Sequence, residues 1–198
     1  FNPMGVSDAE LAELHAKKFA VMDDAIGEKM QERILQAKSE LNSVGGVIEA
    51  VALHLPAGIG APYFDSVESM LSHALFSVPA VKGVEFGDGF GFAGLTGAEA
   101  NDALHYVDGK VQALTNHNGG VTGGITNGMP LVVRVAIKPT PSIAREQQTV
   151  SLKEQADTTL AIVGRHDPCI VQRAVPVIEA VVAWTLWDLL LEAKKWEK

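Results

Sequence analysis

The segment from residue 174 to residue 191 is the feature that most limits how this chain can fold. Glu179 and Asp188 are its only charged residues, so a helix formed by it is apolar on almost every side and must be buried in a protein core or in a bilayer. Each of these acids would cost about 2.5–3.5 kcal/mol at the centre of a bilayer. We therefore predict a core helix at about residues 175–196, with Pro176 in its first turn and no membrane partner.

Helical patterns also occur earlier in the chain. Ser7 and Glu10 have the spacing of a capping box, and the apolar positions that follow predict a helix over residues 7–42 with a joint at Gly27. Asp65 and Glu68 have the spacing of a second capping box, which predicts a helix over residues 65–78. The charged side of the first helix is expected to face solvent.

Runs of β-branched residues between Gly and Pro predict strands. Asp108-Gly109, flanked by apolar residues, is a strong signal for a tight hairpin turn. The strands are expected at residues 47–55, 79–87, 130–137, 150–152 and 158–163. Helices and strands in this order predict an α+β fold, in which a mostly antiparallel sheet has helices packed against it.

The composition argues against several functions. The formal net charge is −8, whereas nucleic-acid binding needs a surplus of Lys and Arg, so we expect no nucleic-acid partner. The six His are scattered without an i, i+4 pair, and there is one Cys. This pattern argues against a metal site or an internal disulfide and fits a reducing cytoplasm. Residues 1–4 lack the basic start and apolar run of a secretory signal.

Two glycine pairs, Gly119-Gly120 and Gly123-Gly124, remove side chains where another group comes close. Their backbone N–H groups can face an anion, as in nest-type phosphate sites. The spacing matches neither a Walker loop nor the dinucleotide-binding fingerprint. Ordinary glycine turns are the alternative explanation of this segment.

The segment Lys138-Pro139-Thr140-Pro141-Ser142 combines a cation with two hydroxyls. Its two prolines restrict the backbone, so these groups are presented at a low entropic cost. A cation beside hydroxyls suits a phosphate monoester or the phosphate end of a flavin. The alternative is a rigid loop between two strands.

The segment from Gly164 to Cys169 brings a guanidinium, an imidazole, a carboxylate and a thiol close together in the sequence. Arg165 offers a fork for a phosphate or a carboxylate, and His166 and Asp167 are candidates for acid–base work near neutral pH. The Asp-Pro step also occurs in plain turns and at helix starts. Cys169 follows a proline and has no base beside it, so we expect it to be structural.

These segments together resemble chorismate synthase. They occur in the family's order and with similar spacing, over about residues 43–191, which is far more specific than any single motif. Asn118 departs from the pattern, because many relatives have a small residue there. The matching segments are Ser43 to Glu49, Leu55 to Pro62, Val81 to Phe90, Thr115 to Gly124, Arg134 to Ser142, Gly164 to Cys169 and Arg173 to Pro176.

The resemblance implies the anti-1,4-elimination of phosphate from 5-enolpyruvylshikimate 3-phosphate, which gives chorismate and is the last common step of aromatic amino acid biosynthesis. Family members need reduced FMN although the reaction has no net redox change, and NADP is relevant where a relative reduces its own flavin. They are cytoplasmic homotetramers with a β-α-β layered fold. We expect the same cofactor, substrate and assembly here.

The resemblance also assigns roles to residues. Arg165 matches an arginine at the flavin and at the substrate phosphate. Asp167 matches a catalytic aspartate proposed to work with flavin N5 in removing the ring proton. The expected FMN-contacting positions are Pro79, Ala80, Gly123, Lys138, Pro139, Thr140, Pro141, Ser142 and Arg165. These roles agree with the chemistry of the side chains, and the flavin itself would carry the electronic part of the reaction.

The features of the family's N-terminal half do not occur in this sequence. They are a Gly-Glu-Ser-His-Gly segment, an arginine-rich substrate region and two histidines proposed as acids. Residues 1–198 therefore resemble the C-terminal part of a single chorismate synthase domain, with a helical lead-in at 1–42 and a core at 43–198. We expect little or no turnover from this chain alone. A flavin-binding or assembly module is the alternative, and a generic sugar-phosphate-binding protein is a third interpretation.

Overall fold

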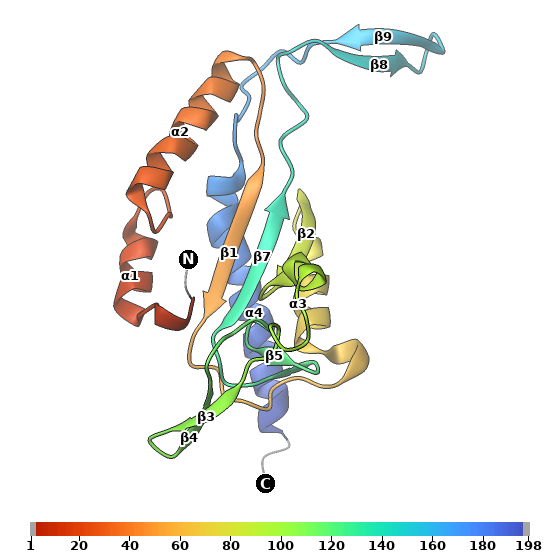
Figure 1. The fold of residues 1–198 in the computed structure, drawn as a ribbon. Helices are drawn as coiled ribbons and strands as arrows, with labels where there is room; N and C mark the ends of the chain where they lie inside the picture. Colours follow the sequence, from red (N-terminus) through yellow and green to blue (C-terminus); the bar gives the residue numbers. More distant parts are fainter. Residues whose placement is uncertain (1–2, 196–198) are drawn as a thin grey trace.

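The computed structural model describes residues 3–195. The helices are α1 (Asp8–Ala16), α2 (Asp24–Ser39), α3 (Val67–Phe76) and α4 (Val171–Lys194), with short 3-10 helices η1 (Pro3–Gly5), η2 (Tyr63–Asp65) and η3 (Gly89–Gly94). The strands are β1 (Gly46–Ala52), β2 (Val81–Phe86), β3 (Leu104–Val107), β4 (Lys110–Ala113), β5 (Val121–Thr122), β6 (Ile125–Thr126), β7 (Leu131–Ile137), β8 (Gln147–Ser151) and β9 (Ala156–Leu160). Helices lie beside antiparallel strands (Figure 1), so the predicted α+β class is confirmed.

The central sheet contains β1, β7 and β2, in that order, and both pairings are antiparallel. β7 lies in the middle, and its side chains at 131, 133, 135 and 137 alternate towards the core. Helices α3 and α4 cover this face of the sheet, with α4 behind it in Figure 1. The β-branched residues of β7 therefore serve as the floor of the core.

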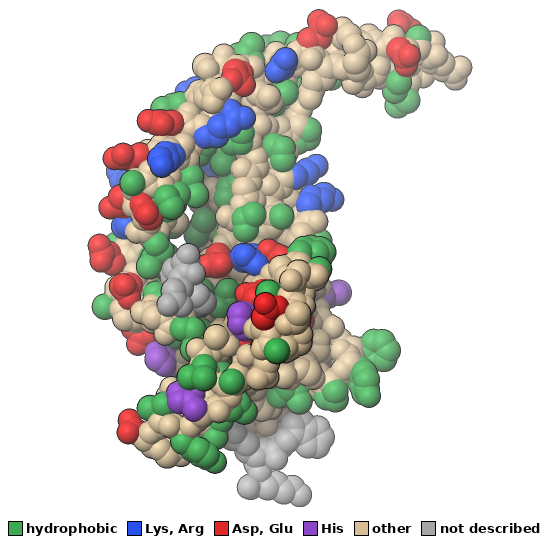
Figure 2. All heavy atoms as spheres, in the orientation of Figure 1, with side chains coloured by type: hydrophobic (Ala, Val, Ile, Leu, Met, Phe, Trp, Pro, Cys, Tyr) green, Lys and Arg blue, Asp and Glu red, His purple; other side chains and the backbone are tan. Residues whose placement is uncertain are grey.

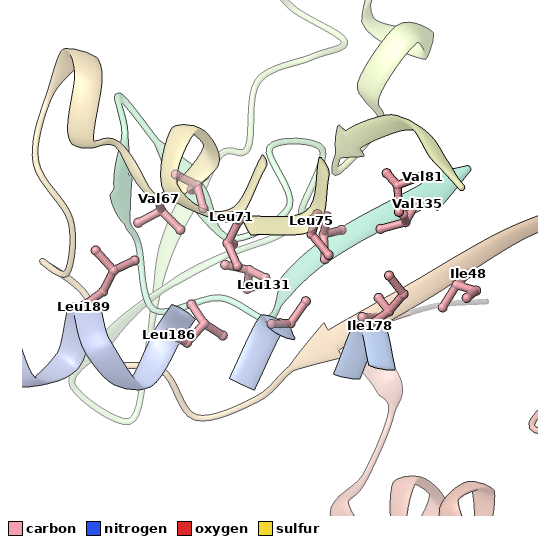
Figure 3. Packing of buried hydrophobic residues seen from close by; sticks show 14 of the residues in the cluster. Ile48, Val67, Leu71, Leu75, Val81, Leu131, Val135, Ile178, Leu186 and Leu189 are labelled. Carbon is pink, nitrogen blue, oxygen red and sulfur yellow. The ribbon is translucent and has the colours of Figure 1, made fainter. Parts of the chain in front are cut away.

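The hydrophobic core lies between the sheet and the two helices. Leu71 and Leu75 of α3, Val135 of β7 and Ile178 of α4 are completely buried. Figure 3 shows these side chains pointing into the space between the helices and the strands. Burial of one such side chain contributes about 1.5–3 kcal/mol to folding. These contacts therefore hold α3, β7 and α4 together, although the three elements lie far apart in the sequence.

The N-terminal helical region is divided at a point different from the one predicted. The chain leaves the helix between α1 and α2, whereas Gly27 lies inside α2 and is buried. Asp23 starts the second helix, because its carboxylate accepts a hydrogen bond from the Ile26 N–H at 3.0 Å. The capping box of Ser7 and Glu10 is confirmed, and the hydrogen bonds from Ser7 hold the pKa of Glu10 below its usual value.

The start of α3 also differs from the prediction. Asp65 belongs to η2, and Ser66 caps the helix instead of the expected pair Asp65 and Glu68. The Ser66 hydroxyl accepts a hydrogen bond from the Ser69 N–H at 3.1 Å. The two candidate caps are adjacent in the sequence, and only the backbone geometry of the preceding turn decides between them.

The C-terminal helix begins earlier than predicted. α4 starts at Val171, so Pro176 lies inside the helix rather than in its first turn. The predicted end at Trp196 lies outside the described residues. By length and composition, α4 is long and apolar enough to cross a bilayer, a property that it shares with core helices of soluble proteins.

Only one face of α4 is buried, so the prediction of a fully buried core helix is wrong in part. Val182 and Leu186 pack towards the sheet. On the opposite face, Trp184 is 80% exposed and Trp187 is 61% exposed. The described residues therefore cover only one of the two apolar sides of α4.

Among the described residues, three β-hairpins lie outside the central sheet: β3–β4, β5–β6 and β8–β9. Asp108 (φ 49°) and Gly109 (φ 77°) form a two-residue turn between β3 and β4, which confirms the predicted hairpin. Positive φ at both residues is typical of the turn that matches the twist of two strands. β8 and β9 pair with each other and project from the body (Figure 1), at positions close to the two predicted strands.

Candidate functional site

Three loops meet at one end of the central sheet. Antiparallel pairing places both Gly46, where β1 begins, and Val81, where β2 begins, opposite Ile137, where β7 ends. We call this the Ile137 end of the sheet. The segments just outside it include residues 79–80 and 138–142, so the fold brings two of the predicted site segments together.

Pro79 and Ala80 enter β2 in an uncommon conformation. Ala80 has a φ of +75°, in the left-handed region that a side chain disfavours. Its carbonyl oxygen accepts a hydrogen bond from the Lys138 N–H at 2.9 Å. Backbone strain of this kind costs about 1–3 kcal/mol and is concentrated at functional sites. The predicted residues Pro79, Ala80 and Lys138 are therefore direct neighbours.

The segment from Lys138 to Ser142 presents its polar groups in two different ways. The Lys138 side chain is exposed and has no ion-pair partner among residues 3–195. The Thr140 hydroxyl is buried and has no hydrogen-bond partner within the same range. The Thr140 carbonyl accepts a hydrogen bond from the Ser43 hydroxyl at 2.5 Å. A buried hydroxyl without a partner is costly, so Thr140 is a strong candidate for a ligand contact.

The corner from Gly164 to Cys169 lies beside these loops. The Val44 N–H donates to the Pro168 carbonyl at 2.9 Å, and Val44 follows the serine that holds Thr140. The Asp167 carboxylate accepts a hydrogen bond from the Cys169 N–H at 3.2 Å and forms an ion pair with Arg173 at 2.7 Å. Both oxygens of Asp167 are therefore held in place.

His166 and Arg165 behave differently from each other. His166 Nε2 lies 2.8 Å from the Ile162 carbonyl oxygen, and because a carbonyl only accepts, the ring donates this hydrogen bond. The guanidinium of Arg165 is exposed and has no partner among the described residues 3–195. Arg165 is thus free to bind an anion, whereas His166 holds the corner together.

Two residues of this site were not assigned a role from the sequence. They are Ser43, which holds the Thr140 loop, and Arg173, which holds Asp167. Both lie in the segments that carry the family resemblance, which is the signal that could have found them. Arg173 adds a cation to Lys138 and Arg165 in these segments, and Figure 2 shows Lys and Arg side chains beside the upper parts of β2 and β7.

Gly123 lies at the other end of the sheet. Its hairpin, β5–β6, is held by loops that follow β1 and precede β7. The length of β7 separates it from Lys138, about 20 Å at ~3.3 Å per residue. The structure therefore does not bring Gly123 together with the other predicted site residues, and its contact with flavin stays a prediction. At position 119 the fold itself requires a glycine, because a Cβ there would overlap the backbone of Gly87.

A second polar cluster surrounds this glycine-rich loop. Asp102 is its centre, because its two oxygens accept four hydrogen bonds, from the Thr115 hydroxyl (2.8 Å), the His117 N–H (2.8 Å), and the N–H (3.0 Å) and side-chain amide (2.8 Å) of Asn118. Burial raises the pKa of Asp102, but these hydrogen bonds outweigh burial and hold the pKa below its usual value. Asn118, the unusual residue of this loop, thus has a structural partner.

A His–Asp contact and an ion pair extend this cluster. His117 Nδ1 lies 2.6 Å from Asp88 Oδ2, and Arg134 Nε lies 3.1 Å from Glu85 Oε1. Arg134 also donates to the Gly87 carbonyl at 2.9 Å. Figure 2 shows these types of side chain gathered around the lower part of β7. Buried Arg134 Nε lacks a hydrogen bond of good geometry, but the other contacts tie the loop to β2 and β7, so the cluster supports the loop.

The fold is an α+β domain whose Ile137 end carries exposed cations and, among the described residues, a buried hydroxyl without a hydrogen-bond partner, on loops next to a rigid sheet. The chain belongs to the chorismate synthase family, because the family model described as chorismate synthase matches residues 4–191.

Curated relatives and a solved structure agree with this assignment. The chain is 51% identical over 175 residues to a protein named chorismate synthase from Thermococcus gammatolerans, covering 88% of this chain and 49% of the relative. It is 49% identical over 171 residues to one from Dehalococcoides mccartyi, covering 86% and 47%. A crystal structure of chorismate synthase superposes with a TM-score of 0.74 at 31% identity, covering 92% of this chain and 48% of that chain. The chain therefore spans about half the length of the relatives it matches.

Proposed function

We propose that this chain forms the flavin- and phosphate-binding part of a chorismate synthase, which eliminates phosphate from 5-enolpyruvylshikimate 3-phosphate to give chorismate. The observation that carries the proposal is the convergence of residues 79–80, 138–142 and 164–169 at the Ile137 end, through the bonds of Lys138 to Ala80, Ser43 to Thr140 and Val44 to Pro168. Family membership supports the reaction. A cytoplasmic homotetramer is part of the same proposal.

The residues at the Ile137 end fit reduced FMN. The buried Thr140 hydroxyl lacks a partner, and a phosphate oxygen is a strong acceptor for it. Lys138 and Arg165 would balance the charge of the phosphate, while Pro79, Ala80 and the prolines of 138–142 offer rigid backbone. When bound, reduced FMN supplies electron density to the carbon–oxygen bond that breaks.

The chain's own residues would handle the proton and the leaving group. Arg173 and the Cys169 N–H orient the Asp167 carboxylate, and this fixed orientation supports a role for Asp167, together with the flavin, in removing the ring proton. Arg165 offers its free fork to the phosphate that leaves. Neutralisation of that charge is worth most when it develops in the transition state.

The isolated chain is expected to release almost no phosphate. The two histidines proposed as acids in the family, and its arginine-rich substrate region, do not occur in this sequence. The assay mixes the chain, anaerobically reduced FMN and substrate, and measures inorganic phosphate. The full-length Thermococcus gammatolerans relative serves as the positive control. Phosphate release by the isolated chain at the rate of that control would refute this expectation.

The alternative is a flavin-binding or assembly module without turnover, which the exposed face of α4 favours. Titration with FMN distinguishes the possibilities by fluorescence quenching. Stoichiometric quenching that Lys138→Ala abolishes supports retained flavin binding. Lys153→Ala, in the turn between β8 and β9, is the matched control that removes a lysine elsewhere. Absence of quenching leaves an assembly role, and equal affinity for simple sugar phosphates would support the generic phosphate binder.

A further inference from the structure

Two of the six asparagines precede a glycine, and both lie in the loops around β5 and β6. They form the steps Asn118-Gly119 and Asn127-Gly128. In such a step the backbone nitrogen of the glycine can attack the side-chain amide carbon of the asparagine, because a glycine has no side chain that would obstruct the approach. The local sequence makes the two steps equivalent, so a difference in their reactivity must come from the fold.

The reaction that follows this attack is a deamidation with a defined balance of atoms. Hydroxide removes the proton of the glycine N–H. The nitrogen forms a bond to the asparagine Cγ, the bond from Cγ to the side-chain nitrogen breaks, and ammonia leaves with a proton taken from water. Water then opens the cyclic succinimide at one of its two carbonyls, which gives aspartate or isoaspartate. No atom is oxidised or reduced, so water is the only co-reactant.

The Asn127 side chain is arranged for this attack. Its Oδ1 accepts a hydrogen bond at 3.0 Å from the Met129 N–H, two residues further along the chain. Such a turn folds the side chain of the asparagine over the peptide that follows it, which here is the Gly128 peptide. Negative charge develops on Oδ1 as the nitrogen attacks Cγ, and the Met129 N–H already points at this atom. The hydrogen bond therefore favours the attack on Asn127.

The attacking nitrogen is accessible as well. Gly128 is exposed, and its N–H makes no hydrogen bond within residues 3–195. A Cβ at position 128 would lie 3.7 Å from the Ala57 Cβ, an ordinary van der Waals contact. Hydroxide can therefore reach the Gly128 N–H, and the backbone around it has room to move.

The Asn118-Gly119 step is protected at the same points. The side-chain amide of Asn118 donates to Asp102 at 2.8 Å, and its backbone N–H donates to the same carboxylate at 3.0 Å. Gly119 is buried, and its N–H donates to the Asn116 carbonyl at 3.1 Å. The nearby carboxylate also opposes the anionic nitrogen that must form before the attack. The fold therefore holds this step in an unreactive arrangement.

We propose that Asn127 is a site of spontaneous deamidation, in which Gly128 supplies the attacking nitrogen, and that the fold protects Asn118 from the same reaction. The modified loop joins β6 to β7, near the end of the sheet where β5 lies (Figure 1). Aspartate at position 127 loses the hydrogen bond that the Asn127 amide donates to the Thr122 hydroxyl at 3.1 Å. Isoaspartate in addition adds a carbon atom to the main chain just before β7.

The test incubates the whole chain at about pH 6 and about pH 9 and follows the products by mass spectrometry. Trypsin cleaves after Lys110 and Arg134, so one peptide contains both steps, and its fragmentation assigns the change in mass to one asparagine. We expect Asn127 to deamidate at least ~10-fold faster than Asn118 in the folded chain, and faster at the higher pH. In urea at the same pH, where Asp102 no longer holds the loop, the two rates should become similar.

A pair of glycine substitutions tests the attacking residue. Gly128→Ala puts a methyl group beside the nitrogen and should slow the deamidation of Asn127 at least ~10-fold. Gly109→Ala is the matched control, because Gly109 also has a positive φ (+77°, against +84° for Gly128) and lies in the turn between β3 and β4. A Cβ at position 109 meets no atom within 4 Å. Circular dichroism checks that both variants are folded.

Each outcome supports or overturns the proposal. Faster reaction of Asn127 in the folded chain, with rates that converge in urea, supports it. Equal rates in the folded chain, or a faster reaction of Asn118, would overturn it. Deamidation that occurs only in urea would do the same, because the fold would then protect Asn127. A wild-type rate in Gly128→Ala would also overturn it. All these measurements are made without flavin or substrate, so their result is independent of the proposed function.

Discussion

Substitution of Asp102 tests the support of the glycine-rich loop most directly. The carboxylate accepts two hydrogen bonds on each oxygen: Oδ1 from Thr115 and His117, and Oδ2 from the N–H and the side chain of Asn118. Asp102→Ala removes all four acceptor contacts. Asp102→Asn keeps one acceptor oxygen, which can serve two of the four donors. Its NH₂ group faces the other two donors and cannot accept their hydrogen bonds.

The size of the effect follows from this geometry. A hydrogen bond contributes about 1 kcal/mol net, and more when one partner is charged, but partial exposure reduces the gain, so about 0.8 kcal/mol for each bond is a fair value. Asp102→Ala should then lower the free energy of unfolding by about 3 kcal/mol, and Asp102→Asn by about 1.5 kcal/mol. The two variants form a graded pair.

The pH dependence has a definite sign. The folded-state pKa of Asp102 lies below its usual value. Its stabilisation is therefore fully present above the unfolded pKa of about 3.9 and is lost as the pH falls through the lower folded pKa. The difference in stability between the wild type and Asp102→Asn should be largest at neutral pH and should shrink below about pH 4.

Urea denaturation followed by circular dichroism measures these free energies at several pH values. Asp157→Asn, an exposed acid on β9, is the control and should have no effect beyond about 0.5 kcal/mol. The reasoning is refuted if Asp102→Ala unfolds with the wild-type free energy, or if its effect is the same at pH 7 and pH 3.

Three further predictions concern the core and the loops. Leu71→Ala should lower the free energy of unfolding by about 2–5 kcal/mol in urea, because Leu71 is completely buried. Gly119→Ala should cost clearly more than Gly123→Ala, since both residues have φ near +60° but only a Cβ at 119 meets neighbouring backbone; equal costs would contradict this. Thr140→Val should raise the free energy of unfolding by up to about 1–2 kcal/mol, because it removes a buried hydroxyl that has no partner among the described residues. The same substitution should weaken FMN binding, and a loss of stability would contradict the burial argument.

Local signals predicted most elements of this fold correctly. The Asp108-Gly109 turn and the Ser7–Glu10 capping box depend on neighbouring residues and are present in the structure. The errors lie at boundaries, where two local signals compete. Ser66 rather than Asp65 caps α3, and Asp23 rather than Gly27 sets the division between α1 and α2. Caps are decided by the path of the preceding chain, which periodicity does not report.

The candidate site divides in the same way. Its segments were found from the sequence, because rigid prolines, glycines and charged groups are visible in order along the chain. Their spatial grouping required the antiparallel register of β1, β2 and β7, which joins residues 79–80 to 138–142 and leaves Gly123 at the far end. The contacts of Arg173 with Asp167 and of Ser43 with Thr140 likewise appear only once the chain is folded.

The sequence by itself determined the α+β class, the family and the chemical character of the site, because these depend on residue types in a fixed order. The tertiary structure decided which apolar surfaces are covered. α4 is apolar on both sides in the sequence, yet it is buried on one side only, and β1 reads as an ordinary strand, yet its outer edge is open along a groove. Burial depends on what packs against a face, and that partner can lie far away in the sequence.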